Sequence, residues 1–162
     1  MATKVTLTSR FPAGAESALA ALSNEAVLDE VMRESESLDP VVEVRRQPGH
    51  VEIHIKRSFS EDWPALVASF IGDRLQIEEE RRWQQTGPGQ WSGHLKLHTP
   101  GLPVELTAAL ELSDIETGSE LTIDGLLRCS VPFIGGKVEQ MAADLVADGF
   151  RLEAEVAARH CH

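Results

Sequence analysis

Hydrophobic residues recur at three- and four-residue steps near the end of the chain, between about Val138 and Arg159. The recurring positions, which would form one continuous apolar stripe on a helix, are Val138, Met141, Leu145, Leu152 and Val156. A run of strands precedes this segment, and such a stripe needs a sheet to cover it. The pattern therefore predicts a long amphipathic C-terminal helix that lies against a sheet, with space between the two.

Alternating apolar and polar residues predict strands in most of the remaining chain. A first strand runs until Pro12 ends it, and two short helices follow, the second opened by Ser23 or Asn24. Next comes a hairpin whose turn is at residues 47–50. Four further strands, separated by glycine- and proline-containing turns, cover about residues 75–83, 91–99, 104–112 and 121–131.

Residues 60–72 interrupt this alternation. Asp62 can cap a helix and Gly72 can end it, so a short extra helix is predicted near residues 62–71. Trp63 and Phe70 would share one face of this helix. It would serve either as a lid over the space beneath the long helix or as a plug for one end of the core.

These elements predict an α+β protein: a curved antiparallel sheet of about seven strands, in the order β-α-α-β6-α, wrapped around the long C-terminal helix. The 162 residues suit a single domain spanning 1–162, which would bury about 70% of its unfolded surface. The net charge of −11 argues against nucleic acid or an anionic membrane as the main partner.

The sequence also lacks the patterns typical of membrane insertion and of secretion. No segment approaches the roughly 20 consecutive apolar residues of a membrane span, and the N-terminus does not have the pattern of a signal peptide. Cys129 and Cys161 are too few for a disulfide framework. We therefore expect a cytoplasmic protein that does not insert into a membrane.

Two segments resemble a known family. One begins Trp63-Pro64-Ala65-Leu66 and ends at Trp83; the other is Ser130-Val131-Pro132-Phe133-Ile134-Gly135-Gly136-Lys137-Val138-Glu139. Together with the order of elements, they resemble the START-like superfamily, which includes lipid-transfer domains, pollen-allergen-type proteins and polyketide cyclases, and within it an uncharacterised bacterial branch of unknown function. The resemblance implies a helix-grip fold and carries over no catalytic residues.

Strand alternation predicts which side chains face the long helix. One row across the sheet would contain Val44, Ile53, Glu79, Leu97, Val104 and Cys129. The neighbouring row would contain Arg46, Val51, Arg81, Leu95, Leu106 and Leu127. In these rows Glu79 and Arg81 are about 7 Å apart, and Arg46 is roughly 10 Å from Arg81.

Two guanidinium groups against one carboxylate would leave positive charge inside the sheet, where isolated ions are costly. We hypothesise that this charge holds the acidic head of a lipophilic ligand. The alternative is a solvated cluster at the rim or a structural ion pair. Arg57 also faces inward, where it would extend to water. The candidate lining residues are Arg46, Arg57, Trp63, Phe70, Glu79, Arg81, Leu95, Leu97, Leu106, Leu127, Met141 and Leu145.

Other chemistry receives little support. The histidine pairs on single strands are about 13 Å apart, so no metal site is expected, and no cofactor fingerprint or catalytic triad is present. The sequence thus favours binding of a small lipophilic ligand, anionic or neutral, between the sheet and the C-terminal helix. Two alternatives stay open: a cyclase- or hydrolase-like enzyme that uses Glu79 in the same cavity, and a chaperone-associated protein-interaction module.

Overall fold

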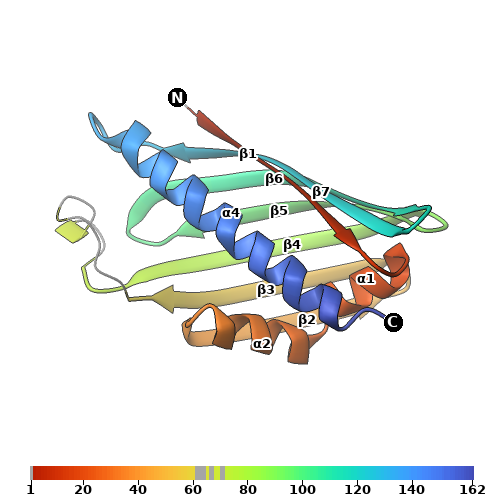
Figure 1. Ribbon diagram of the computed structural model, residues 1–162. Helices are drawn as coiled ribbons and strands as arrows, with labels where there is room; N and C mark the ends of the chain where they lie inside the picture. The colour runs from red at the N-terminus through yellow and green to blue at the C-terminus, as the bar shows by residue number, and fades with distance from the viewer. Residues whose placement is uncertain (1, 61–64, 66–67, 70–71) are drawn as a thin grey trace.

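The computed structural model describes the whole chain except residues 1, 61–64, 66–67 and 70–71 (Figure 1). The strands are β1 (Ala2–Phe11), β2 (Leu38–Gln47), β3 (His50–Phe59), β4 (Leu75–Gly87), β5 (Gln90–Thr99), β6 (Leu102–Ile115) and β7 (Gly118–Cys129). The helices are α1 (Ala15–Leu22), α2 (Glu25–Glu34) and α4 (Gly135–Arg159). The order of elements is the predicted one; the short helix expected near 62–71, with Trp63 and Phe70, falls on the stretch that contains the residues outside this description.

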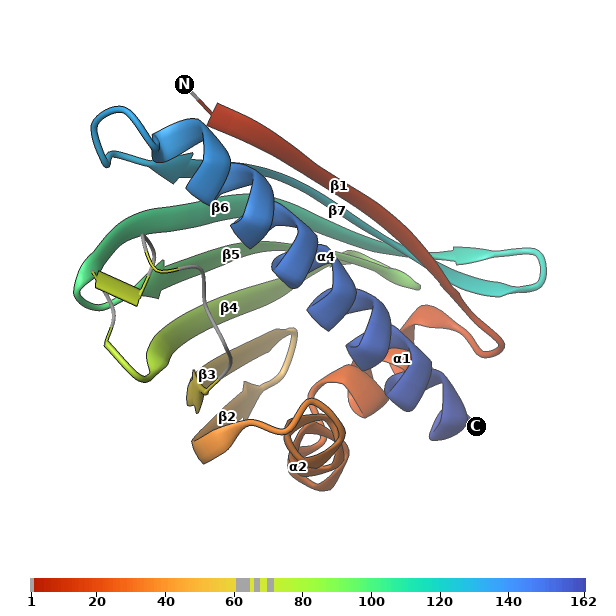
Figure 2. The ribbon, with the colours of Figure 1, turned by 60° about the vertical axis from the view of Figure 1, so that its left-hand side comes forward.

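The seven strands of the described residues form one antiparallel sheet in the order β1-β7-β6-β5-β4-β3-β2. Figure 2 shows this sheet curving behind α4, which crosses its inner face diagonally, while α1 and α2 lie near the C-terminal end of α4. The core is formed by the alternate strand residues that face α4, as the fully buried Leu106 and Leu127 illustrate. The predicted α+β helix-grip architecture is therefore confirmed.

One predicted strand alignment, between β3 and β4, is wrong by two residues. Ile53 lies opposite Arg81, where the sequence placed Glu79 opposite it. Because the connection between these strands is long, no tight turn fixes their register. As a result, Arg46 lies in the row of Val51 and Trp83, two residues along the strands from the row of Arg81.

The predicted alignment of β5 with β6 is also wrong by two residues. Thr99 pairs with Leu102 at the turn as expected, but the next pair is His98 with Glu105. The irregularity leaves two residues of β6, Pro103 and Val104, without partners in β5. Pro103 has no N–H group to donate to a neighbouring strand. Because two residues are added, the inner face of β6 stays inner, and the predicted core residues remain buried.

The N-terminal end of α4 is attached to the sheet through the buried Glu139. Its carboxylate accepts a hydrogen bond of 3.0 Å from the backbone N–H of Cys129 and one of 2.9 Å from the hydroxyl of Thr3. Just before it, a Cβ atom on Gly135 would lie 2.8 Å from the carbonyl oxygen of Cys129. The chain can therefore turn this tightly from β7 into α4 only with glycine at that position.

We expect Glu139→Gln to lower the urea midpoint at neutral pH more than Glu155→Gln, which changes an exposed carboxylate of the same helix. The hydrogen bonds from Cys129 and Thr3 hold the pKa of Glu139 below its ordinary value. The unfolded chain therefore binds this proton more readily, so the stabilisation is complete above the ordinary carboxyl pKa and is lost as pH falls through the folded pKa. Urea midpoints measured from pH 7 to pH 3 should become more similar for the two variants as the pH falls. A difference between the two midpoints that stays the same at all pH values would contradict this.

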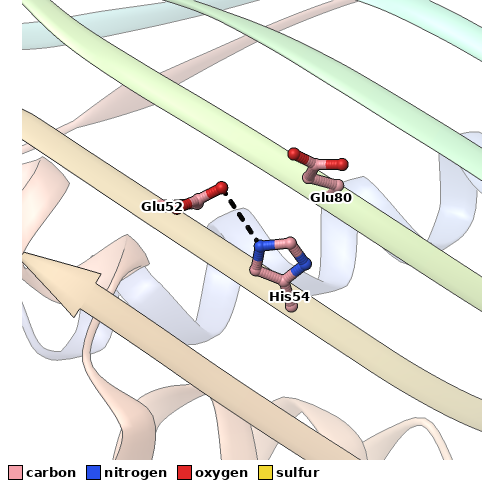
Figure 3. A group of neighbouring side chains, drawn as sticks. All are labelled: Glu52, His54 and Glu80. Carbon is pink, nitrogen blue, oxygen red and sulfur yellow. Dashed lines mark ion pairs between the residues drawn. The ribbon is translucent and has the colours of Figure 1, made fainter.

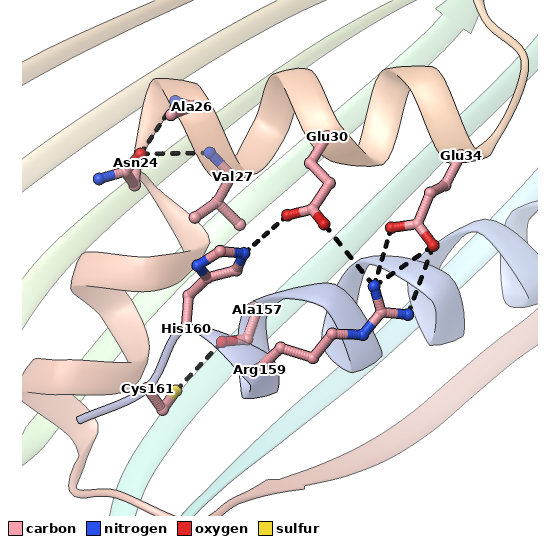
Figure 4. A network of polar contacts seen from close by, with 9 residues as sticks. All are labelled: Asn24, Ala26, Val27, Glu30, Glu34, Ala157, Arg159, His160 and Cys161. Carbon is pink, nitrogen blue, oxygen red and sulfur yellow. Dashed lines mark hydrogen bonds and ion pairs between the residues drawn. The ribbon is translucent and has the colours of Figure 1, made fainter.

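Polar contacts join the other end of α4 to α2 (Figure 4). Arg159 pairs with Glu34 at 3.1 Å, and Nε2 of His160 lies 2.6 Å from Glu30. The start of α2 is capped by Asn24, one of the two residues predicted for this role, whose Oδ1 accepts from two backbone N–H groups. α2 is thereby held beside the C-terminal half of α4. Among the helices described, none has the length and apolar character required to span a bilayer.

Candidate functional site

A pocket of about 210 Å³ lies between α4, α2 and strands β3 to β5. Most of its wall is apolar, and charged groups enter it from β3, β4 and α4. The described lining residues are Val31 and Met32 of α2 and Ser35 just after it; Arg57 and Phe59 of β3; Leu75, Ile77, Glu79 and Arg81 of β4; Leu97 of β5; and Leu145, Val146, Asp148, Gly149, Phe150, Leu152 and Glu153 of α4. An apolar hollow with a few converging polar groups is the usual form of a small-molecule site.

Gly149 helps to form this space from the middle of α4. A Cβ atom at this position would meet nothing within 4 Å outside its own part of the helix, so the glycine is not required for close packing of the helix on the sheet. Glycine inside a helix costs about 1 kcal/mol relative to alanine. The helix therefore carries a residue that lowers its stability at a position that lines the pocket.

Arg81 forms the centre of a buried ionic cluster at the pocket wall. Its guanidinium pairs with Glu79, its neighbour but one on β4, and with Glu153 of α4 at 2.6 Å. The exposed side-chain fractions are only 8%, 2% and 8% for Arg81, Glu79 and Glu153, so these charges depend on one another rather than on water. Burial alone would lower the pKa of Arg81, but the two carboxylates outweigh it and raise that pKa above its ordinary value. The ring of Phe150 lies 5.8 Å from the guanidinium carbon.

Arg57 is the second cation of the pocket and has a different environment. Within the part of the chain that the structure describes, no carboxylate oxygen lies within ion-pair distance of it. Its Nη1 approaches only the sulfur of Met32 at 3.7 Å and the hydroxyl of Ser37 at 3.5 Å, and its guanidinium carbon lies 5.1 Å from the ring centre of Phe59. Burial lowers the pKa of Arg57, and attraction to the carboxylates of the Arg81 cluster offsets this only in part.

The predicted lining residues divide into five groups. Those around the pocket are Arg57, Glu79, Arg81, Leu97 and Leu145. Those packed in the neighbouring core are Leu95, Leu106 and Leu127, while Met141 lines a smaller hollow nearer the start of α4. Trp63 and Phe70 lie outside the described residues. Arg46 is elsewhere.

The position of Arg46 removes the predicted surplus of positive charge at Arg81. Arg46 is exposed, and its Nη2 donates a 2.6 Å hydrogen bond to the carbonyl oxygen of Ser23 after α1. Glu153 takes the place beside Arg81 that the sequence had assigned to Arg46. The sequence does contain a signal for Glu153: it follows Phe150 by three residues and precedes Val156 by three, so a carboxylate interrupts the apolar stripe of α4.

A second group of polar residues lies on the outer face of the sheet (Figure 3). The ligand-type atoms of Glu52, His54 and Glu80 all lie within 4.8 Å of one another. Arg82 donates to Glu80 at 2.6 Å and reaches Glu52 at 3.3 Å, so both carboxylates already have a cation. The group forms part of a partly exposed network of ion pairs, which has little influence on stability.

Sequence comparison places the chain in a family. The sequence pattern of DUF2505, a protein family of unknown function, matches residues 6–161. The chain belongs to the DUF2505 family. No curated protein matches this DUF2505 chain. The second segment quoted above for its resemblance, Ser130 to Glu139, is the tight turn and carboxylate anchor through which β7 leads into α4.

Solved structures share the fold of this DUF2505 protein at low sequence identity. TTHA0849 from Thermus thermophilus is 11% identical, with a TM-score of 0.64 over 98% of this chain and 96% of that one. Human STARD10 is 10% identical, with a TM-score of 0.63 over 97% and 64%. The di-domain ARO/CYC protein StfQ of the steffimycin biosynthetic pathway is 12% identical, with a TM-score of 0.61 over 99% and 51%. The DUF2505 chain therefore has a START-like helix-grip fold.

Proposed function

We propose that this protein binds a small lipophilic molecule in the pocket between α4, α2 and strands β3 to β5. The observation that carries the proposal is Gly149, a residue unfavourable to the helix whose missing side chain leaves space in that pocket. The apolar wall supports a lipophilic ligand because burying apolar surface is the main source of binding energy. Structures of the same fold include a START protein and a cyclase, which is consistent with a role based on a cavity.

The size of the pocket favours a compact ligand. Its volume of about 210 Å³ is below the range of roughly 300–1,000 Å³ typical of sites for drug-sized molecules. A single short alkyl chain or a small ring system suits this space better than a lipid with two acyl chains.

The geometry gives less support to the enzymatic alternative. The pocket contains two carboxylates, Glu79 and Glu153, whereas the sequence had identified one. Both are acceptors for the guanidinium of Arg81, which fixes them in place as partners of a buried cation. A general acid or base must instead be able to reach a proton of the substrate. We therefore favour binding without a reaction.

Native mass spectrometry of the protein purified from its own source tests this proposal. We expect a noncovalent adduct of small mass that is lost on denaturation and can be recovered by extraction into organic solvent. Protein stripped of this adduct should then take up octanoate or 1-octanol with a stoichiometry of one. A chain that carries no adduct and takes up neither probe would contradict the proposal.

A further inference from the structure

We infer that the ligand is an organic acid whose anionic group binds Arg57. This inference rests on the proposed function and names the chemical class of the ligand and the residue that recognises it. The recognising cation thus differs from the pair of arginines, Arg46 and Arg81, that the sequence suggested.

Arg57 has donors available for a ligand. A guanidinium carries five N–H donors, and the only hydrogen-bond contacts of this one in the described residues are 3.7 Å to sulfur and 3.5 Å to a hydroxyl oxygen, long for hydrogen bonds. Its side chain is half-buried in a mostly apolar wall, where water solvates a charge poorly. A planar oxyanion would satisfy two of these donors at once, in the bidentate geometry that arginine favours.

The other charges of the pocket make Arg57 the favoured position for an anion. Arg81 already has two carboxylate partners, so an anion there would face Glu79 and Glu153 directly. At Arg57 neither carboxylate is within ion-pair distance, and the nearest polar groups belong to α2 and the residues after it. Ser35 also lines the pocket on this side, but its hydroxyl is already hydrogen-bonded to the carbonyl oxygen of Met32 at 3.2 Å and to the hydroxyl of Ser37 at 2.8 Å, so Arg57 supplies the donors for the anion.

The arrangement also gives the ligand an orientation. Arg57 enters the pocket from β3, whereas Gly149 leaves space on the helix that forms another wall. With its anionic group at Arg57, a short apolar body can extend along Ile77 and Leu97 toward the space at Gly149. One end of the ligand would then be recognised by charge and the other by shape.

Isothermal titration of two probes with the same chain length, octanoate and 1-octanol, tests the inference. We expect the wild-type protein to prefer octanoate, and Arg57→Met to weaken octanoate binding by about 10- to 100-fold while 1-octanol changes by less than about threefold. Lys56→Met is the matched control: it removes the same charge from the adjacent, outward-facing position and should keep the preference. Retained 1-octanol binding by Arg57→Met would also show that the pocket is intact.

Two results would overturn the inference. If wild-type protein binds both probes equally, or if Arg57→Met keeps the preference for octanoate, the ligand is not an acid recognised by Arg57, although the proposed pocket stands. If neither probe binds the wild-type protein, the proposed function fails, and the inference fails with it.

Discussion

Arg81→Met should destabilise the protein by about 3–5 kcal/mol, because it leaves two buried carboxylates without their cation. Glu79 and Glu153 are almost inaccessible to water, and Arg81 is the ion-pair partner of both in the described structure. Methionine approximates the aliphatic part of arginine, so the loss reflects charge more than volume. Urea unfolding at neutral pH, followed by far-UV circular dichroism, measures the effect.

Two comparisons make this prediction specific. Arg82→Met alters the next residue of β4, whose largely exposed guanidinium pairs with Glu80 and Glu52, and should cost less than about 1 kcal/mol. Replacing the whole cluster in the triple variant Glu79→Gln, Arg81→Met and Glu153→Gln should restore much of the stability, since no charge is then left unpaired. If Arg81→Met is no more harmful than Arg82→Met, the cluster is solvated and does not form a buried unit.

The sequence was sufficient to predict the architecture because the deciding signals are periodic and local. Alternation defined the strands, and three- and four-residue steps defined the length of α4. Asn24 marks the start of α2 through its side-chain oxygen, and Gly135 marks the start of α4 through its lack of a side chain. Such features do not depend on which distant residues meet.

The composition of the site depended on those distant contacts, and the prediction was correspondingly weaker. The inward direction of Arg81 follows from the period of two along β4, which a register shift of two residues leaves unchanged. The neighbours of Arg81 do change under such a shift, so Arg46 was placed near it incorrectly. Glu153 comes from α4, and no rule of strand pairing can bring a helix residue to a given strand position.

Gly149→Leu should abolish ligand binding and stabilise the folded chain. Leucine is a strong helix former, so replacing glycine in the interior of α4 should add about 1 kcal/mol to the free energy of unfolding. Its side chain would enter a space where a Cβ atom meets nothing within 4 Å, and would occupy part of a pocket of only about 210 Å³. Titration with octanoate and 1-octanol, with urea unfolding of the same samples, measures both effects.

The opposite directions of these two effects separate function from folding. A destabilised variant loses binding trivially, whereas a stabilised one that no longer binds has lost the space itself. Gly136→Leu is the matched control, because this glycine also lies in α4 with no atom within 4 Å of its Cβ position but is exposed and away from the pocket. It should bind both probes as the wild type does. If Gly149→Leu binds them equally well, the ligand does not occupy the space at Gly149, and the proposal that this glycine serves binding is wrong.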